Sequence, residues 1–212
     1  KKEMAEKSSV LITGASTGIG AVYADRFARR GHNLILVARD AARLNALAEK
    51  LQAQYGIQAE VLPADLTSSG EVETVARRLR EDARIGLLVN NAGMSLSGTF
   101  ITQSEVDISR MTAVNLNAVL TLAHAAATGF AARGHGSIIN LSSVVGLAPE
   151  FGMSVYGATK AFVLYLSQGL NQELRAQGVY VQAVLPAATR TEIWERSGVD
   201  VSTLTGVMDA GE

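Results

Sequence analysis

The chain lacks the residues from which disulfide bonds and most metal sites are built. None of its 212 residues is cysteine, which excludes disulfides and thiolate-bound metals. The three histidines, His32, His124 and His135, are scattered, and no ligand spacing links them to carboxylates. We therefore expect no metal site.

An excess of charge of one sign and long apolar runs are missing as well. The formal net charge is −1 and no block of like charge occurs, so neither a nucleic acid nor a membrane is expected as a partner. No apolar run reaches the length of a membrane-spanning helix, and residues 1–9 are polar without the core of a signal peptide. With 48% apolar residues and no repeat or linker, the chain is expected to form a single cytoplasmic domain over residues 1–212.

Apolar segments that favour strands alternate with helical patterns along the whole chain. Several strands are apolar throughout, which is typical of a parallel sheet covered by helices on both faces. Right-handed crossovers then give an α/β fold of the Rossmann type, a doubly wound parallel sheet in three layers. The predicted strands are 8–12, 33–38, 58–62, 86–90, 136–141 and 179–185; the predicted helices end near residues 30 and 55, cover 69–82 and 156–174, and include a short helix and a long one containing Asn115 within 104–133.

A glycine-rich turn follows the first predicted strand. Gly14, Gly18 and Gly20 have the spacing G-x-x-x-G-x-G, which differs from the dinucleotide fingerprint G-x-G-x-x-G. Glycines between a strand and a helix let the backbone approach a ligand closely, and the helix N-terminus offers N–H groups to phosphate. The turn predicts a phosphate site, and a role in packing alone is the alternative.

Charged side chains follow the second and third predicted strands. Arg39 stands where strand–helix–strand units read the adenosine ribose, and an arginine there suits the 2′-phosphate of NADP, whereas an acid would suit NAD. The alternatives are that Arg39 is a solvated loop charge and that Asp40 contacts a ribose. Asp65 ends the third strand, either as a ligand-binding group or as the cap of a turn.

Tyr156 and Lys160 are four residues apart, about one helical turn, so they lie on one helix face. An ammonium close to a phenol lowers the pKa of the tyrosine, and a hydroxyl from another segment, such as Ser143, can hold a carbonyl oxygen against it. This arrangement predicts a proton-transfer site, and an amphipathic helix with one solvent-seeking lysine is the alternative. All of these segments follow strand carboxyl ends, so we expect them to converge on one crevice.

In these segments the sequence resembles the short-chain dehydrogenase/reductase family, in its compact single-domain form. The resemblance covers about residues 8–195, and the motifs occur in family order at family-like spacings. They are residues 13–20 (TGASTGIG), Asp65-Leu66, residues 90–93 (NNAG), Asn115, Ser143, residues 156–160 (YGATK), and Pro186 with Thr191.

The resemblance implies an oxidoreductase that transfers a hydride between a nicotinamide and a carbonyl or secondary alcohol. It makes Tyr156 the general acid or base and Ser143 the group that orients the substrate oxygen, while Ser142 is one residue off the family spacing. It makes Lys160 a ligand of the nicotinamide ribose that depresses the tyrosine's pKa, and Asn115 the holder of a water in a proton relay. The implied cofactor is NADP(H) in preference to NAD(H), bound by Gly14, Ser16, Thr17, Gly18, Ile19, Gly20, Arg39, Asp65, Leu66, Asn91, Ala92, Gly93, Tyr156, Lys160, Pro186, Thr189 and Thr191.

The predicted substrate wall is more apolar than charged. It indicates an apolar ketone, aldehyde or secondary alcohol as the substrate, and packing of these side chains against a lid is the alternative. The predicted substrate residues are Met94, Ser143, Val145, Met153, Tyr156 and Trp194.

The sequence departs from the family pattern in two places. Ala187 follows Pro186 where the family usually has glycine, which strains the loop if that position needs a positive φ. The chain ends at Glu212, so the substrate lid around 187–212 is expected to be incomplete. The resemblance also implies a homodimer or homotetramer. The alternative functions are the same chemistry with NAD, and cofactor binding without turnover in a regulatory protein.

Overall fold

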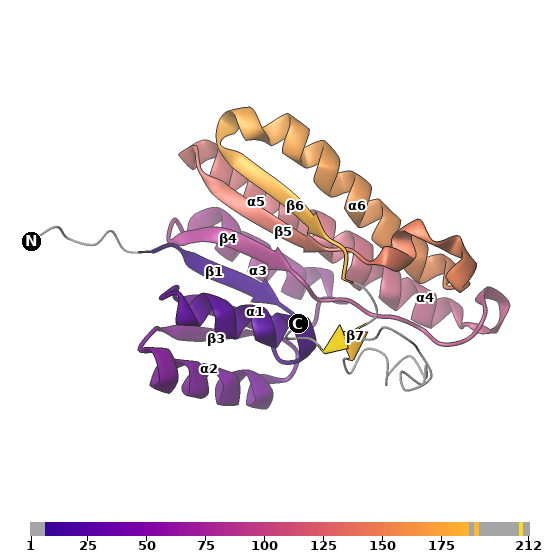
Figure 1. Cartoon of the computed structure of the whole chain (residues 1–212), viewed down its shortest axis with the longest axis horizontal. Coiled ribbons are helices and arrows are strands. Elements are labelled where there is room, and N and C mark those ends of the chain that lie inside the picture. The colour runs from indigo at the N-terminus through magenta and orange to yellow at the C-terminus, as the bar shows by residue number, and fades with distance from the viewer. Residues whose placement is uncertain (1–6, 187–188, 191–207, 210–212) are drawn as a thin grey trace, which may run out of the picture.

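The computed structural model describes residues 7–186, 189–190 and 208–209, which form a parallel sheet flanked by helices (Figure 1). The strands are β1 (Ser9–Thr13), β2 (Leu34–Ala38), β3 (Ala59–Pro63), β4 (Ile85–Asn90), β5 (Gly136–Leu141), β6 (Val179–Val184), β7 (Thr189–Arg190) and β8 (Met208–Asp209). The α-helices are α1 (Gly18–Arg29), α2 (Ala41–Tyr55), α3 (Ser69–Glu81), α4 (Glu105–Thr112), α5 (Val119–Arg133) and α6 (Ser154–Leu174). Short 3-10 helices are η1 (Phe100–Thr102), η3 (Val144–Leu147), η4 (Pro149–Phe151) and η5 (Arg175–Gln177), and η2 (Ala113–Ala118) is a π-helix.

The main sheet has six strands in the order β3-β2-β1-β4-β5-β6, and every neighbouring pair is parallel. The chain runs outward from β1 to β3, returns to the centre at β4 and continues to β6. This is the doubly wound, Rossmann-type order that the alternation of strands and helices predicts. The order reverses between β1 and β4, so their carboxyl ends mark the crevice where open α/β sheets bind ligands.

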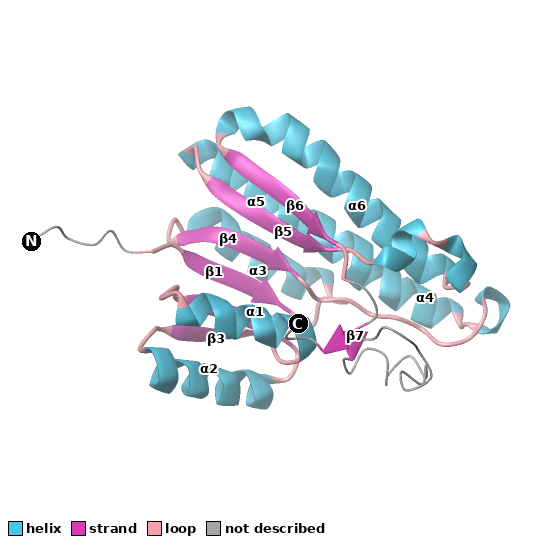
Figure 2. Ribbon diagram, in the orientation of Figure 1, coloured by secondary structure: helices cyan, strands magenta, loops and turns pink. Residues whose placement is uncertain are grey.

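Helices cover the two faces of the sheet unequally. Figure 2 shows α1 and α2 in front of the sheet and α3 and α5 behind it. One core packs α3 and α5 against the sheet, and a second packs α1 and α2 against the half that contains β1 and β2. On the α1 side, no helix of the described ranges lies over β5 and β6, where Ile139 is half-buried and Tyr180 is 62% exposed. Helices therefore cover both faces of the sheet, as predicted, with α1 and α2 over the β1–β2 half on one side.

The helical stretch before β5 differs from its prediction. The sequence predicts a short helix and a long α-helix that contains Asn115, but Asn115 lies in η2, the π-helical segment that joins α4 to α5. Apolar periodicity reveals a helix but not a widened turn within it, so this segment has no signal in the sequence. π-Helical segments are rare and occur frequently at functional sites.

A buried polar ladder fixes the strands that carry the site. The Asn90 side chain donates to the Asn140 side chain over 3.0 Å, and Asn140 in turn donates to the Ser167 hydroxyl over 3.0 Å. All three residues are at most 3% exposed. Because buried amides without partners are costly, this ladder ties β4, β5 and α6 together in one arrangement.

Candidate active site

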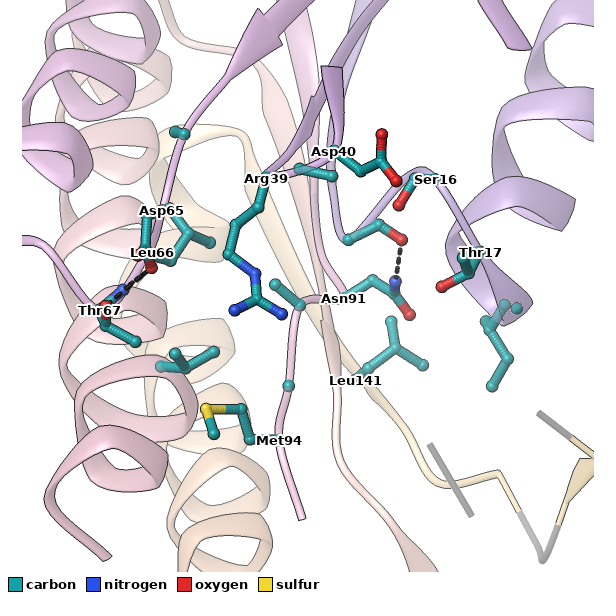
Figure 3. Close-up of a pocket in the computed structure, with 18 of the residues that line it drawn as sticks. Ser16, Thr17, Arg39, Asp40, Asp65, Leu66, Thr67, Asn91, Met94 and Leu141 are labelled. Carbon is teal, nitrogen blue, oxygen red and sulfur yellow. Dashed lines mark hydrogen bonds between the residues drawn. The ribbon is translucent and has the colours of Figure 1, made fainter. Parts of the chain in front are cut away.

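The carboxyl ends of the strands surround one cavity of about 480 Å³, to which the segments after all six strands of the sheet contribute (Figure 3). The convergence predicted from the sequence is therefore present. The predicted site residues that line the cavity are Gly14, Ser16, Thr17, Gly18, Ile19, Arg39, Asp65, Leu66, Asn91, Ala92, Gly93, Met94, Ser143, Tyr156, Lys160 and Pro186.

The glycine turn after β1 requires glycine for two different reasons. Gly14 and Gly18 have φ values of 62° and 54°, in the left-handed region that favours glycine. A Cβ on Gly20 would stand 2.1 Å from the Gly14 carbonyl oxygen. Gly20 does not line the cavity, so its role is to let α1 pack against the turn, while Gly14 and Gly18 shape the surface that faces a ligand.

The N-terminus of α1 is open to an anion. The Thr17 side chain is at the N-cap but makes no capping hydrogen bond, and the first turn of α1 contains no acidic residue. The first backbone N–H groups of a helix lack intrahelical partners and carry the positive end of the helix dipole. Because Thr17, Gly18 and Ile19 line the cavity, this end of α1 is suited to a pyrophosphate.

Asn91 braces the glycine turn from the neighbouring strand. Its side-chain nitrogen donates to the carbonyl oxygens of Thr13 and Gly14, each over 3.1 Å. The Thr13 hydroxyl accepts in return from the backbone N–H groups of Asn91 and Ala92, each over 3.0 Å. These bonds join the ends of β1 and β4, so Asn91 holds the turn in shape in addition to lining the cavity.

Arg39 and Asp65 lie at the nucleotide end of the crevice. Figure 3 shows the Arg39 side chain reaching into the cavity between Asp65 and Asn91. Asp65 Oδ1 accepts from the backbone N–H and the hydroxyl of Thr67, and these bonds, with smaller help from the nearby Arg39 charge, hold the pKa of the Asp65 carboxyl below its usual value. Of the two alternatives for Asp65, the cap of a turn is therefore observed, and the residue also lines the cavity.

At the opposite end, α6 presents Tyr156 and Lys160 to the cavity. The Lys160 ammonium lies 5.6 Å from the centre of the Tyr156 ring and donates to the Leu141 carbonyl oxygen over 3.0 Å. Ser143, which follows β5, accepts from the Val145 backbone N–H over 3.2 Å and hydrogen-bonds with Tyr156. The three side chains that the sequence predicts to work together are thus next to one another.

The pKa of Tyr156 moves in the direction opposite to the prediction. The sequence predicts that the Lys160 ammonium lowers it, but burial raises the pKa of the tyrosine above its usual value, and the hydrogen bond with Ser143 only partly opposes this. Burial also lowers the pKa of Lys160 to about 8. Desolvation disfavours both charged forms, so the phenol is neutral at pH 7 while the lysine is still mostly protonated.

The Asn115 side chain is held by hydrogen bonds to two segments of the chain. Its side chain accepts from the Met94 backbone N–H and donates to the Met94 carbonyl oxygen, each over 2.8 Å, and it also donates to the Thr159 hydroxyl over 3.2 Å. Thr159 in turn donates to the Tyr156 carbonyl oxygen over 2.7 Å. Asn115 is 1% exposed and does not line the cavity, so it acts on the site through Met94 and α6.

Ser142 is excluded from the role of Ser143 by its partner. Its hydroxyl donates to the Lys160 carbonyl oxygen over 2.7 Å, and the residue is only 3% exposed. It therefore fastens α6 to the end of β5, which agrees with the preference for Ser143.

Several predicted residues lie outside the cavity or outside the described residues. Val145 is 7% exposed and packs against Gly157, and Met153 is the N-cap of α6; neither lines the cavity. Their contact with a substrate stays a prediction. The backbone of Thr189 is in β7, whereas Ala187, Thr191 and Trp194 lie outside the described residues, as does most of the predicted lid.

Eight residues that line the cavity are outside the predicted site, although Asp40 was named as an alternative ribose contact and Ser142 was weighed against Ser143. Ala38, Ala64 and Leu141 are apolar strand-end residues without a chemical signature, whereas Arg43 carried a signal, since it is a basic residue one turn after Arg39. The eight are Ala38, Asp40, Arg43, Ala64, Thr67, Val114, Leu141 and Ser142.

The described residues fit a nicotinamide dinucleotide. The cavity joins the open N-terminus of α1 to the Tyr156 and Lys160 pair. Gly93 also lines the cavity, and a Cβ on it would stand 3.4 Å from the Lys160 ammonium. Among the described residues no helix is long and apolar enough to span a membrane, and no group of three His, Cys, Asp or Glu is placed to hold a metal ion.

Relatives at the sequence level include reductases. The very-long-chain 3-oxoacyl-CoA reductase of Anas platyrhynchos is 36% identical over 190 residues, which cover 86% of this chain and 60% of that protein. The protein of the same name from Homo sapiens is 31% identical over 187 residues, with the same two coverages. The chain thus spans about 60% of the length of these relatives.

Two solved structures with the same architecture share more of the sequence. A short-chain dehydrogenase from Sphingobium yanoikuyae in complex with NADPH is 61% identical, with a TM-score of 0.95 over 96% of this chain and 80% of that one. The bulky-bulky ketone specific alcohol dehydrogenase from Comamonas testosteroni is 53% identical, with a TM-score of 0.90 over 97% of this chain and 79% of that one. A family model described as short chain dehydrogenase matches residues 8–201. With its fold, its cavity and these matches in agreement, the chain belongs to the short-chain dehydrogenase/reductase family.

Proposed function

We propose that the protein is an NADP-dependent oxidoreductase that interconverts a ketone and a secondary alcohol, with Tyr156 as the general acid or base. The observation that carries the proposal is that one cavity joins the glycine turn and Arg39 at one end to Ser143, Tyr156 and Lys160 at the other. When bound, the nicotinamide supplies or accepts the hydride.

In the direction of reduction, Tyr156 gives its hydroxyl proton to the carbonyl oxygen of the substrate. A raised pKa keeps the phenol protonated at neutral pH, so the proton is available. As the proton leaves, the nearby Lys160 ammonium stabilises the phenolate that forms. The Ser143 hydroxyl is hydrogen-bonded to the Tyr156 phenol. From this position Ser143 holds the substrate oxygen against the phenol. In the direction of oxidation these steps are reversed, and Tyr156 accepts the hydroxyl proton of the alcohol.

The NADP preference is proposed from Arg39, because its guanidinium reaches into the nucleotide end of the cavity. The NADPH complex of the Sphingobium yanoikuyae protein supports it. The test is a fluorescence titration with NADPH and NADH on the parent and on Arg39→Ala. We expect NADPH to bind more tightly to the parent and Arg39→Ala to remove about a tenfold preference, since a bidentate arginine–phosphate contact is lost. Equal binding of NADH by the parent would favour the NAD alternative.

The proposed substrate is a ketone or secondary alcohol with apolar substituents. The segment after Ser143 exposes Leu147 and Phe151, which are 64% and 61% exposed, and Met94 lines the cavity. The Comamonas testosteroni structure is of an alcohol dehydrogenase specific for bulky-bulky ketones, which supports the proposal. A steady-state screen with NADPH should show turnover of apolar ketones; turnover of highly charged substrates alone would contradict the proposal.

We also propose a homo-oligomer. Val106 on α4, Leu120 on α5 and Tyr165 on α6 are 68%, 44% and 82% exposed, and exposed apolar side chains on neighbouring helices favour contact with a second copy. Light scattering of the purified chain should give a multiple of 22.3 kDa, and a monomer at micromolar concentration would contradict this. The cytoplasmic location expected from the sequence stays a prediction.

A further inference from the structure

The segment that carries Ser143 contacts α6 at a single peptide unit. Ser142 and Gly146 flank Ser143 in the sequence. The Ser142 hydroxyl donates to the Lys160 carbonyl oxygen over 2.7 Å. A Cβ on Gly146 would stand 2.8 Å from the Ala161 backbone nitrogen and 2.9 Å from the Lys160 carbonyl carbon, which belong to the same peptide unit. Residues on either side of Ser143 therefore meet the turn of α6 that carries Lys160.

Gly146 is needed at this contact for space and not for its backbone conformation. It is not among the glycines with a positive φ, so its backbone would accept an alanine. Unbonded carbon atoms pack at about 3.5–4.0 Å, so that alanine would press η3 and α6 apart by roughly 0.7 Å. A second close approach lies one turn earlier on α6, where a Cβ on Gly157 would stand 3.2 Å from the Val145 carbonyl oxygen. Two glycines thus let η3 lie directly on α6.

The segment that carries Ser143 is also attached to the end of β6. The Ser142 backbone N–H donates to the Val184 carbonyl oxygen over 2.8 Å, and the Val144 N–H donates to the Pro186 carbonyl oxygen over 3.4 Å. Ser143 stands between these two bonds in an extended conformation, with φ −161° and ψ 152°. Because β6 holds the segment from the other side, atoms added between the segment and α6 change the distance between them.

The two side chains that α6 presents to the cavity depend on the same contact. The Lys160 ammonium donates to the carbonyl oxygen of Leu141, the residue just before Ser142. Tyr156 lies one turn before Lys160 on the same helix face and hydrogen-bonds with Ser143. The approach of η3 to α6 therefore determines how far the Ser143 hydroxyl lies from the phenol.

We propose that Ser142 and Gly146 are positioning residues for the reaction, and that together they set the distance at which Ser143 faces Tyr156. Gly146 sets how closely η3 approaches α6, and the Ser142 hydroxyl fixes the end of β5 to the Lys160 turn. The inference rests on the proposed function, since it concerns the groups that hold the substrate oxygen and transfer its proton.

The experiment compares the parent with Gly146→Ala, Ser142→Ala and Tyr156→Phe. For each protein, kcat and KM are measured with NADPH and an apolar ketone, the dissociation constant of NADPH by fluorescence titration, and the melting temperature by circular dichroism. We expect Gly146→Ala to lower kcat about 20-fold, because a misplacement of 1 Å can reduce a rate about 100-fold. Ser142→Ala should lower kcat about fivefold, since it releases α6 without forcing it away. In both variants KM and the dissociation constant should stay within about twofold of the parent, a split that a loss of stability alone does not produce.

Two matched controls remove similar features outside the site. Gly169→Ala adds a methyl group to α6 where nothing lies within 4 Å of the new Cβ. Thr128→Val removes a hydroxyl that, like that of Ser142, donates to a helix carbonyl oxygen, in this case that of His124 over 2.8 Å. Both controls should keep the parent's kcat and its NADPH dissociation constant.

The possible failures are distinct. If Tyr156→Phe abolishes turnover but Gly146→Ala and Ser142→Ala keep the parent's kcat, the positioning role is wrong and the proposed function stands, even where the melting temperature has fallen. If Tyr156→Phe keeps the parent's kcat, or the parent reduces no ketone, the proposed function is wrong and the inference is wrong with it. Should Gly146→Ala fail to fold, the kcat of Ser142→Ala decides the question.

Discussion

The two ends of the cavity are built in different ways. At the nucleotide end, the surface is made of backbone and exposed charge: the glycine turn, the open N-terminus of α1, and Arg39 with Arg43. At the catalytic end it is made of buried side chains, of which Lys160 is 6% and Ser143 8% exposed.

The difference follows from what each end has to hold. Phosphate oxygens accept hydrogen bonds from any backbone N–H, so the nucleotide end needs conformation more than side-chain identity. Proton transfer needs particular groups at fixed positions in a dry site. At the catalytic end the Lys160 ammonium donates to the Leu141 carbonyl oxygen, while the Thr159 and Ser142 hydroxyls donate to the backbone carbonyl oxygens of Tyr156 and Lys160. We therefore expect substitutions at the catalytic end to reduce the rate, and those at the nucleotide end to reduce binding.

Tyr156→Phe should give the largest effect and separates the two ends most sharply. It removes the proton donor but keeps the ring, so we expect kcat to fall about 1,000-fold, within the range found for general acid–base groups. NADPH binding, measured by fluorescence titration, should stay within twofold of the parent. A loss of binding equal to the loss of rate would show that the two ends are not separable.

Lys160→Met tests the burial of charge at the catalytic end. The folded-state pKa of Lys160, about 8, is below its unfolded value near 10.4, so between these pH values the unfolded chain binds more protons. The parent's free energy of unfolding should therefore rise relative to Lys160→Met from pH 8 to pH 10, by up to ~3 kcal/mol. Urea unfolding at pH 7, 8, 9 and 10 measures this difference, and a constant difference across the series would contradict the burial of a titrating ammonium.

Gly20→Ala tests whether the nucleotide end depends on backbone packing. Its Cβ would meet the Gly14 carbonyl oxygen at 2.1 Å, so the free energy of unfolding should fall by ~2 kcal/mol and NADPH binding should weaken as the turn shifts. Gly169→Ala is the control, since nothing lies within 4 Å of its added Cβ in the middle of α6. That variant should gain ~0.5 kcal/mol and bind NADPH like the parent. Thermal melting measures the stability of both variants, and fluorescence titration measures their NADPH binding. A Gly20→Ala protein with the parent's stability would refute the close approach of Gly20 to the Gly14 carbonyl oxygen.

Thr159→Val should give the smallest effect. It removes the acceptor of the Asn115 amide and the donor to the Tyr156 carbonyl while it keeps the volume, so stability should fall by ~1 kcal/mol. The rate should also fall, because α6 loses its link to Asn115, whereas Thr159→Ser should keep both bonds and behave like the parent. If Thr159→Val lowers stability but leaves kcat unchanged, the link serves folding alone.

At both ends the sequence predicted the local patterns but not the contacts between segments. The glycine turn, Arg39 and the pairing of Tyr156 with Lys160 are local patterns, and local spacing fixes the turn and the helix face. The role of Gly20 in packing and the double role of Asp65 depend on atoms from other segments. A sequence pattern carries no such distances.

The sequence by itself determined the order of strands and helices, the doubly wound sheet and the family, because strand and helix periodicities and the motifs after each strand are properties of short segments. Only the tertiary structure decided that Asn115 sits in a π-helical turn tied to Met94, that Val145 is packed against Gly157, and that the pKa of Tyr156 is raised. The pKa differs from its prediction for a physical reason. Spacing along α6 places a charge near the phenol, but β5, η3 and α6 must pack together before water is removed from both groups, and desolvation then outweighs the attraction.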